Sequence, residues 1–247
     1  MALSRRDFVK LCSGTVAGFG VSQMFHPAIH EAFAQTLTGE RPPVFWVQGQ
    51  GCTGCSVTLL NSTHPSIADV LLKIISLEFH PTVMAAEGEG AYEHMMRVAE
   101  KFKGKFIFAV EGAVPVAHDG KCCVVAEADH HEVTMTEVTK VLAANAAAVL
   151  AVGTCAAYGG IPAGKGNETG AMGVSAFLKK EGIPAPVINI PGCPPHPDWI
   201  VGTIGLGLQA LATNTLGLLV KQGLDANGRP KAFYKNVHMN CPHLSEI

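Results

Sequence analysis

Five short apolar runs, separated by amphipathic segments, constrain the fold of this chain more than any other feature. The apolar runs cover residues 44–47, 74–79, 106–110, 148–152 and 187–190. The amphipathic segments cover residues 55–73 with a break near Pro65, 89–102, 133–143, 171–180 and 198–212. Buried strands that alternate with helices predict a parallel sheet covered on both faces. We therefore expect an α/β fold, a flavodoxin-like doubly wound parallel sheet.

The composition excludes two classes of partner. The 247 residues carry a formal charge of −2, so no basic surface for nucleic acid is expected. No run approaches the eighteen or so apolar residues of a transmembrane helix, and we expect none in this chain. Only 15% of the residues are charged, which suggests that a protein partner covers part of the surface.

The first 34 residues have the order of an export signal. The paired Arg5 and Arg6 precede a mild, glycine-diluted apolar run, and Ala32-Phe33-Ala34 follows as a small-x-small cleavage site. This order predicts a twin-arginine signal peptide over residues 1–34, with a basic amphipathic helix as the alternative. Its removal takes Cys12 and leaves seven of the eight cysteines, an odd number that favours metal ligation over disulfides alone.

Four of the remaining cysteines follow predicted strands. Cys52 and Cys55 lie on a glycine-rich turn after the first strand, Cys155 follows the fourth strand, and Cys193 follows the fifth. Because the carboxyl ends of parallel strands share one edge of a sheet, we expect these thiols to converge there.

Four convergent thiolates suit a 4Fe-4S cluster or a zinc ion. Structural zinc sites usually draw two close pairs of ligands, whereas here one pair and two single cysteines come from distant loops, which favours iron and sulfur. Zinc in a binding module without redox function stays the alternative, and Cys155 and Cys193 as small buried residues is a third interpretation.

The cysteine motifs carry a resemblance to a known family. Gly-Cys-Thr-Gly-Cys at 51–55, Gly-Thr-Cys-Ala-Ala-Tyr-Gly-Gly at 153–160 and Pro-Gly-Cys-Pro-Pro-His-Pro at 191–197 resemble the electron-transfer small subunit of nickel-iron hydrogenases. The context of residues 48–56 is most similar to the nickel-iron-selenium subgroup of sulfate-reducing bacteria. A related subunit of respiratory complex I is the nearer rival, but it uses adjacent cysteines where this chain has the spaced Cys52 and Cys55.

The resemblance implies the roles of six ligands. Cys52, Cys55, Cys155 and Cys193 would hold the proximal 4Fe-4S cluster, and His238 with Cys241 would be two ligands of a distal 4Fe-4S cluster. The chain would relay electrons between a nickel centre in the partner large subunit and a periplasmic cytochrome with several haems. It would contain no nickel, and it would reach the periplasm with its partner by the twin-arginine pathway.

The sequence departs from the family pattern after Cys241. Family members continue for tens of residues with further cysteine ligands, so we interpret this chain as a fragment whose distal cluster lacks ligands. The expected organisation is a signal peptide at 1–34, a flavodoxin-like proximal-cluster domain at 35–213 and the start of a truncated, irregular iron-sulfur domain at 214–247.

Two carboxylates are weaker candidates for a supporting role. Glu87 follows the second strand and is expected to contact the partner or the cluster loops, unless its loop is simply solvated. Glu111 ends the third strand and is expected to orient a loop or assist proton movement. The vicinal Cys122-Cys123 are interpreted as turn or packing residues, because adjacent cysteines ligate one metal badly. His130-His131 are interpreted as a solvated turn, because adjacent side chains diverge.

Overall fold

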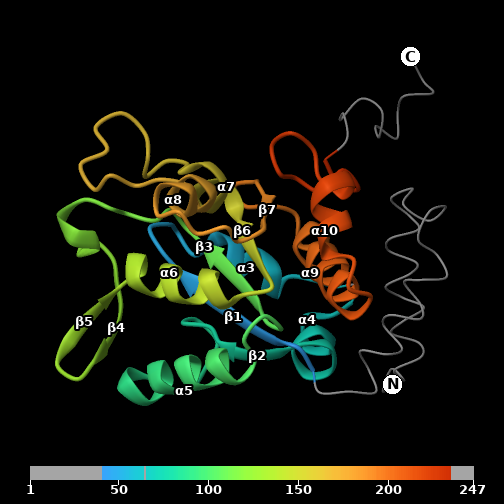
Figure 1. Cartoon of the computed structure of the whole chain (residues 1–247), viewed down its shortest axis with the longest axis horizontal. Helices are drawn as coiled ribbons and strands as arrows, with labels where there is room; N and C mark the ends of the chain where they lie inside the picture. Colours follow the sequence, from blue (N-terminus) through green and yellow to red (C-terminus); the bar gives the residue numbers. More distant parts are fainter. Residues whose placement is uncertain (1–40, 64, 235–247) are drawn as a thin grey trace.

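Five parallel strands form the central sheet of the computed structural model, which describes residues 41–63 and 65–234. The sheet runs in the order β2-β1-β3-β6-β7 (Figure 1). These strands are β1 (Pro43–Gln48), β2 (Ser76–Phe79), β3 (Ile107–Glu111), β6 (Ala148–Val152) and β7 (Val187–Ile190). Counted along the sheet this is the flavodoxin order 2-1-3-4-5, so the predicted fold class is confirmed.

Helices cover both faces of this sheet. One face carries α3 (Gly54–Leu60), α4 (Ile67–Asp69) with its continuation η1 (Val70–Ile74), and α9 (Pro197–Ala212). The other face carries α5 (Gly88–Lys101), α6 (Met135–Asn145), α7 (Gly153–Tyr158) and α8 (Val174–Lys180). The short segments η2 (His118–Gly120), α10 (Leu216–Leu218) and η3 (Leu219–Gly223) complete the described elements.

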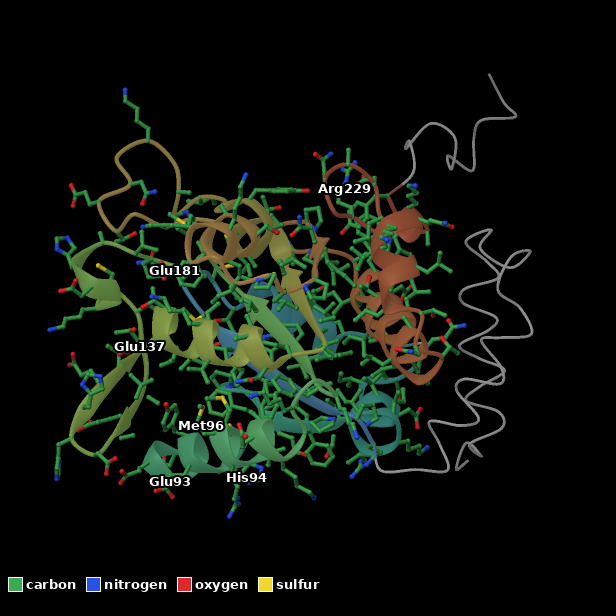
Figure 2. The ribbon with its side chains drawn as sticks, viewed as in Figure 1. Glu93, His94, Met96, Glu137, Glu181 and Arg229 are labelled. Carbon is green, nitrogen blue, oxygen red and sulfur yellow. The ribbon has the colours of Figure 1, made fainter. Side chains whose placement is uncertain are left out.

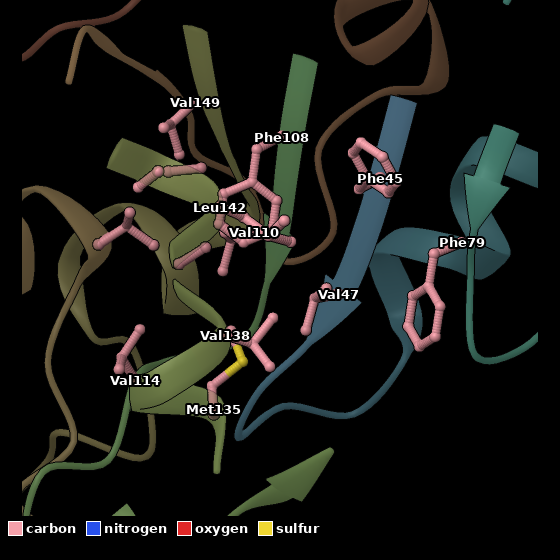
Figure 3. Packing of buried hydrophobic residues seen from close by; sticks show 14 of the residues in the cluster. Phe45, Val47, Phe79, Phe108, Val110, Val114, Met135, Val138, Leu142 and Val149 are labelled. Atoms are coloured by element: carbon pink, nitrogen blue, oxygen red, sulfur yellow. The ribbon is translucent and has the colours of Figure 1, made fainter. Parts of the chain in front are cut away.

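Alternate side chains of the strands feed two hydrophobic cores. Phe108 and Val110 of β3 pack on the face of α6, against Met135 and Leu142 (Figure 3). Their neighbours in β3 point to the opposite face and join the core under α9. Each fully buried side chain of this size stabilises the fold by about 1.5–3 kcal/mol, so the central strands are the most firmly held part of the chain.

A two-stranded hairpin was missed by the sequence prediction. Strands β4 (Val124–Ala128) and β5 (His131–Thr134) are antiparallel, and the turn residues Asp129 and His130 both have positive φ angles of 51° and 60°. Glycine or asparagine usually marks such turns, which is why this one was not recognised. The helix predicted from Val133 begins instead at Met135.

The start of α6 is fixed by a capping box. The Thr134 hydroxyl accepts a hydrogen bond from the Glu137 backbone N–H, while the Glu137 carboxylate accepts one from the Thr134 backbone N–H. Glu137 therefore lies in the first turn of α6, at the end of the helix next to the hairpin (Figure 2). The predicted second strand is also shorter than expected, because residues 70–74 continue the preceding helix as η1.

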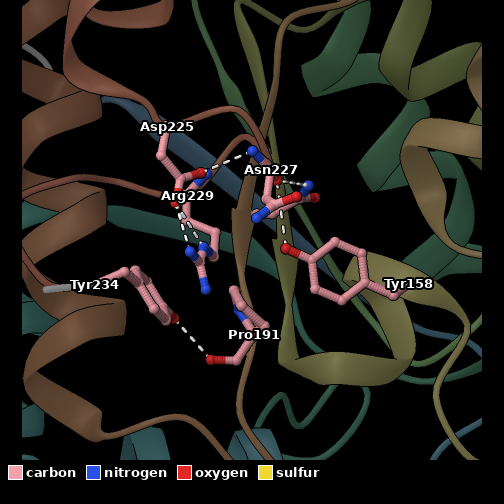
Figure 4. Close-up of polar contacts among 7 residues, drawn as sticks. Tyr158, Pro191, Asp225, Asn227, Arg229 and Tyr234 are labelled. Carbon is pink, nitrogen blue, oxygen red and sulfur yellow. Dashed lines mark hydrogen bonds and ion pairs between the residues drawn. The ribbon is translucent and has the colours of Figure 1, made fainter. Parts of the chain in front are cut away.

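The segment after η3 packs along the edge strand β7. The Asn189 backbone N–H donates to the Gly228 carbonyl at 2.8 Å. The Tyr234 hydroxyl donates to the Pro191 carbonyl at 2.7 Å (Figure 4). The aromatic ring of Tyr234 also lies 4.8 Å from that of Trp199 in α9.

The domain boundary proposed at residue 213 stays a prediction. In the described ranges, no helix combines the length and apolar character that crossing a membrane requires.

Candidate metal centre

Three loops at the carboxyl edge of the sheet carry the four motif cysteines. Cys52 lies in the turn between β1 and α3, Cys55 lies in the first turn of α3, and Cys193 follows β7. Cys155 follows β6 as predicted, but it lies in the first turn of α7, a helix where the sequence suggested a loop. The predicted placement at three strand ends therefore agrees with the structure.

Hydrogen bonds tie the three loops to one another. The Thr154 backbone N–H donates to the Gly192 carbonyl at 2.9 Å, and the Gly192 N–H donates to the Thr154 hydroxyl at 3.1 Å. The hydroxyl of Thr58 in α3 donates to the Pro195 carbonyl at 3.2 Å. These bonds hold together the loops of Cys155 and Cys193 and helix α3, which contains Cys55.

The closest approach between the loops is at Gly153. Its φ angle is +88°, and a Cβ atom built on it would lie only 2.4 Å from the Cys55 sulfur. Real Cβ atoms do not come so close to a neighbour, so only glycine allows Cys55 to lie against the start of α7. This contact places the Cys55 sulfur against the start of α7, the helix that carries Cys155.

The four thiols also influence one another electrostatically. Burial raises the pKa of Cys55 strongly, and the Glu111 carboxylate and the thiols of Cys52, Cys155 and Cys193 raise that pKa further. Burial likewise raises the pKa of Cys155, partly opposed by the Ile161 backbone N–H that donates to it. Across residues 41–63 and 65–234, no three His, Cys, Asp or Glu side chains form a group that could hold one metal ion.

This donor set fits an iron-sulfur cluster. Cysteine thiolates are the ordinary ligands of 4Fe-4S clusters, and cationic iron would offset the mutual repulsion that raises the pKa of Cys55. Gly153 leaves space beside the Cys55 sulfur that a side chain would fill. The Ile161 N–H is a hydrogen-bond donor to the Cys155 sulfur, the kind of contact that tunes cluster potentials.

Glu111 lies beneath the Cys52–Cys55 turn and is only 3% exposed. Its Oε1 atom accepts hydrogen bonds from the backbone N–H groups of Cys55 at 2.9 Å and Ser56 at 3.2 Å. These are N–H groups of the first turn of α3, which lack partners inside the helix. The expectation that Glu111 orients a loop therefore has a structural basis in these bonds, while a role in proton movement stays a prediction.

The backbone around Glu111 is held against the cysteine loop. The Gly49 N–H donates to the Glu111 carbonyl at 2.7 Å, and Gln50 exchanges two hydrogen bonds with Ala113 at 2.9 and 2.8 Å. Gly112 has a φ angle of +85°, and a Cβ there would lie 2.8 Å from the Gly49 carbonyl carbon. The loop after β1 and the end of β3 thus run side by side.

Three further side chains of this region were missed by the sequence analysis. Trp46 Nε1 donates to Glu111 Oε2 at 3.0 Å, the Ser56 hydroxyl donates to the same oxygen, and His80 lies 3.3 Å from Ser56 Oγ. The only available signals were a tryptophan inside an aliphatic strand and a histidine at the end of the second strand. Neither reveals its hydrogen-bonding partner, which lies 65 residues from the tryptophan and 24 residues from the histidine.

Other candidates lie apart from the thiols. Glu87 is exposed at the start of α5, and within the described ranges it makes no hydrogen bond to the cysteine loops, so its contact role stays a prediction. Cys122 and Cys123 are half-buried in the turn before β4. The signal peptide at 1–34 and the ligands His238 and Cys241 lie outside the described residues.

Comparison with known proteins defines the class first. Residues 52–206 match the family model described as NADH ubiquinone oxidoreductase, 20 Kd subunit. This range contains all four motif cysteines, so fold and site together define an α/β subunit of an oxidoreductase. Individual relatives then identify the family within this class.

The chain is 53% identical over 252 residues to the periplasmic NiFeSe hydrogenase small subunit of Desulfomicrobium baculatum, covering 100% of this chain and 79% of that protein. It covers 61% of the Hydrogenase-2 small chain of Escherichia coli K12, at 36% identity over 98% of its own length. The chain belongs to the family of small subunits of periplasmic NiFeSe hydrogenases. As such it is the small subunit of an oxidoreductase that acts on H2 and pairs with a large subunit.

The solved structures agree with this assignment. The recombinant NiFeSe hydrogenase of Desulfovibrio vulgaris Hildenborough superimposes with a TM-score of 0.80 at 67% identity, over 85% of this chain and 76% of that chain. The reduced, active enzyme of Desulfomicrobium baculatum gives a TM-score of 0.78 at 54% identity, over 83% and 75%.

Proposed function

We propose that this chain holds a 4Fe-4S cluster on Cys52, Cys55, Cys155 and Cys193 and relays electrons for its hydrogenase. The supporting observation is the convergence of three hydrogen-bonded loops that deliver four mutually interacting thiols to one edge of the sheet. A cluster bound there would supply electron transfer at a potential set by its surroundings. The chain's own residues orient the thiols, place N–H donors beside them and exclude water from Cys55.

The proposed electron path runs from a nickel centre in the large subunit, through this cluster, to a periplasmic cytochrome with several haems. His238 and Cys241 are proposed as two ligands of a distal cluster further along this path. The periplasmic names of the relatives support the location, and Arg5 and Arg6 support export by the twin-arginine pathway.

The surface beside the thiols is suited to the large subunit. Cys52 and Cys193 are exposed, and exposed apolar side chains follow Cys55 and Cys155 in the chain. These are Val57 and Leu60 of α3, Tyr158 at the end of α7 and Ile161 just after it, the last being 84% exposed. An apolar patch of this kind is typical of an interface, and we propose that the large subunit covers it.

The proposal is tested on the purified two-subunit enzyme. Iron, acid-labile sulfide and zinc are measured together with the EPR spectrum of the reduced protein. We expect acid-labile sulfide, iron in at least an equal amount, and a reduced-cluster signal. Zinc without labile sulfide would support the alternative, a zinc-stabilised binding module without redox function.

A further inference from the structure

His80 is a buried histidine with a defined partner at each ring nitrogen. The residue is buried, with only 2% of its surface exposed, and its ring stacks on that of Trp46 with centroids 5.3 Å apart. The Thr82 backbone N–H points at Nδ1 from 3.2 Å, and Nε2 lies 3.3 Å from Ser56 Oγ. Because a backbone N–H can only donate, Nδ1 accepts and Nε2 carries the ring proton.

Burial favours the neutral form of this ring. It lowers the pKa of His80, although the nearby Glu111 carboxylate and a backbone group of His80 itself act in the opposite direction. The neutral tautomer with its proton on Nε2 is therefore the form that donates to Ser56 Oγ.

The Ser56 hydroxyl has all of its hydrogen-bonding capacity in use. It accepts from His80 Nε2 at 3.3 Å and from Gln48 Nε2 at 2.9 Å, and a hydroxyl can accept only two such bonds. Its single hydrogen is therefore left for Glu111 Oε2, which it meets in a short bond. The two incoming donors fix the direction in which Ser56 donates.

Glu111 connects this chain of hydrogen bonds to the cysteine turn. Its Oε2 atom accepts from Ser56, from Trp46 at 3.0 Å and from Gln48 at 3.2 Å. Its Oε1 atom accepts from the Cys55 N–H. The sequence of donors runs Thr82 to His80 to Ser56 to Glu111, and it ends one hydrogen bond away from a motif cysteine.

We propose that His80 is a positioning residue for the cluster turn, acting through the Ser56 hydroxyl. By donating to Ser56 it keeps the hydroxyl hydrogen on Glu111, and this holds the carboxylate that orients the Cys55 backbone. The inference rests on the proposed function, because its expected consequence is a change in the potential of the proposed cluster. Without the His80 donor, the hydrogen bond from Ser56 to Glu111 weakens. The negative charge of the Glu111 carboxylate beside the cluster is then less well compensated. The potential of the cluster then becomes more negative.

Two substitutions of the same chemistry separate donation from mere occupancy. Glutamine at position 80 is long enough to bring an amide N–H to Ser56 Oγ, whereas asparagine is one methylene shorter and does not reach it. The purified two-subunit enzyme is measured in two ways: the midpoint potential of the proposed proximal cluster by EPR-monitored titration, and hydrogen exchange of residues 52–60. The second readout does not depend on turnover.

We expect H80N to shift the midpoint potential to a more negative value and to speed exchange in residues 52–60, whereas H80Q behaves as wild type. In a Ser56→Ala background, H80N should add no further shift, because its target is gone. An H80N enzyme that matches wild type in both readouts would overturn the inference. Equal shifts in H80Q and H80N would also overturn it, because the imidazole itself would then be required.

Two further outcomes are defined in advance. Where H80N yields no assembled enzyme, S56A decides: a negative shift with H80Q unchanged supports the inference, and an unchanged S56A contradicts it. A wild-type enzyme without any iron-sulfur signal would defeat the proposed function instead. The exchange measurement would then still report whether His80 positions the turn.

Discussion

The backbone N–H of Cys55 donates to Glu111 Oε1 at 2.9 Å, although 56 residues separate them in the chain. Cys55 lies in the first turn of α3, and Glu111 is the last residue of β3, the strand beside β1. The carboxylate therefore does for α3 what an N-cap side chain usually does, since no side chain caps this helix at Thr53. The turn that carries Cys52 and Cys55 is thus held from beneath by a buried carboxylate.

Replacing Glu111 by glutamine should destabilise the enzyme. The amide has one acceptor oxygen in place of two, and its NH2 group would face donors such as Trp46 Nε1. Leaving a buried donor without a partner costs about 1–3 kcal/mol. We expect E111Q to lower the melting temperature of the purified enzyme by several degrees, while the exposed Glu87→Gln control leaves it unchanged. Equal melting temperatures of E111Q and wild type would contradict this role.

Gly153 and Gly166 offer a matched pair for testing the contact between loops. Both have nearly the same backbone conformation, with φ angles of +88° and +87°, but a Cβ at Gly166 meets nothing within 4 Å. Alanine at either site carries left-handed strain of about 1–2 kcal/mol. Only G153A would also push against the Cys55 sulfur. We expect G153A to lose iron and the EPR signal, and G166A to keep both; full iron content in G153A would argue against the close approach.

Ile161 tests the proposed interface with the large subunit. It is 84% exposed and next to the Cys155 loop, whereas Leu72, 70% exposed, lies in η1 at the opposite end of the strands. A buried, unpaired carboxylate at an interface is costly. We expect I161D to weaken association of the two subunits at least about tenfold, a loss of 1.4 kcal/mol. L72D should associate as wild type does, and comparable affinities of the two variants would place the interface elsewhere.

The capping box of α6 makes a small, pH-dependent contribution to stability. The backbone N–H of Thr134 lowers the pKa of Glu137, with further lowering by the Thr134 hydroxyl and His131. Because the folded pKa lies below the unfolded value of about 4.3, the ionised carboxylate stabilises the fold above that pH. This contribution is lost as the pH falls through the folded pKa. We expect the melting temperature of wild type to exceed that of E137Q at neutral pH and to converge with it in acid. The exposed Glu132→Gln should show no such convergence.

The central sheet could be predicted from the sequence because its signal is local and repeated. Runs such as Ala148–Val152 are apolar at every position, as buried parallel strands must be, and the cysteine positions follow directly from where these runs end. The hairpin of β4 and β5 could not be predicted in the same way. Its turn uses Asp129 and His130 in left-handed conformations that favour glycine or asparagine.

The support beneath the thiols lies beyond what such patterns reveal. Trp46, Ser56, His80 and Glu111 come from four separate segments, which meet because β1 pairs with both β2 and β3. Glu111 was a candidate because it ends a strand, but its five donors depend on side-chain directions that sequence spacing does not specify. The role of His80 becomes apparent only from the two partners of its ring.

The central claim is that four thiols hold one iron-sulfur cluster, and Cys193→Ser tests it most directly. Cys122→Ser is the matched control, because Cys122 lies in the turn before β4 and belongs to none of the three loops. Iron, labile sulfide and the reduced-state EPR spectrum are measured on each purified two-subunit enzyme. The account predicts that C193S loses or alters the proximal-cluster signal while C122S matches wild type; an unchanged spectrum in C193S would contradict it.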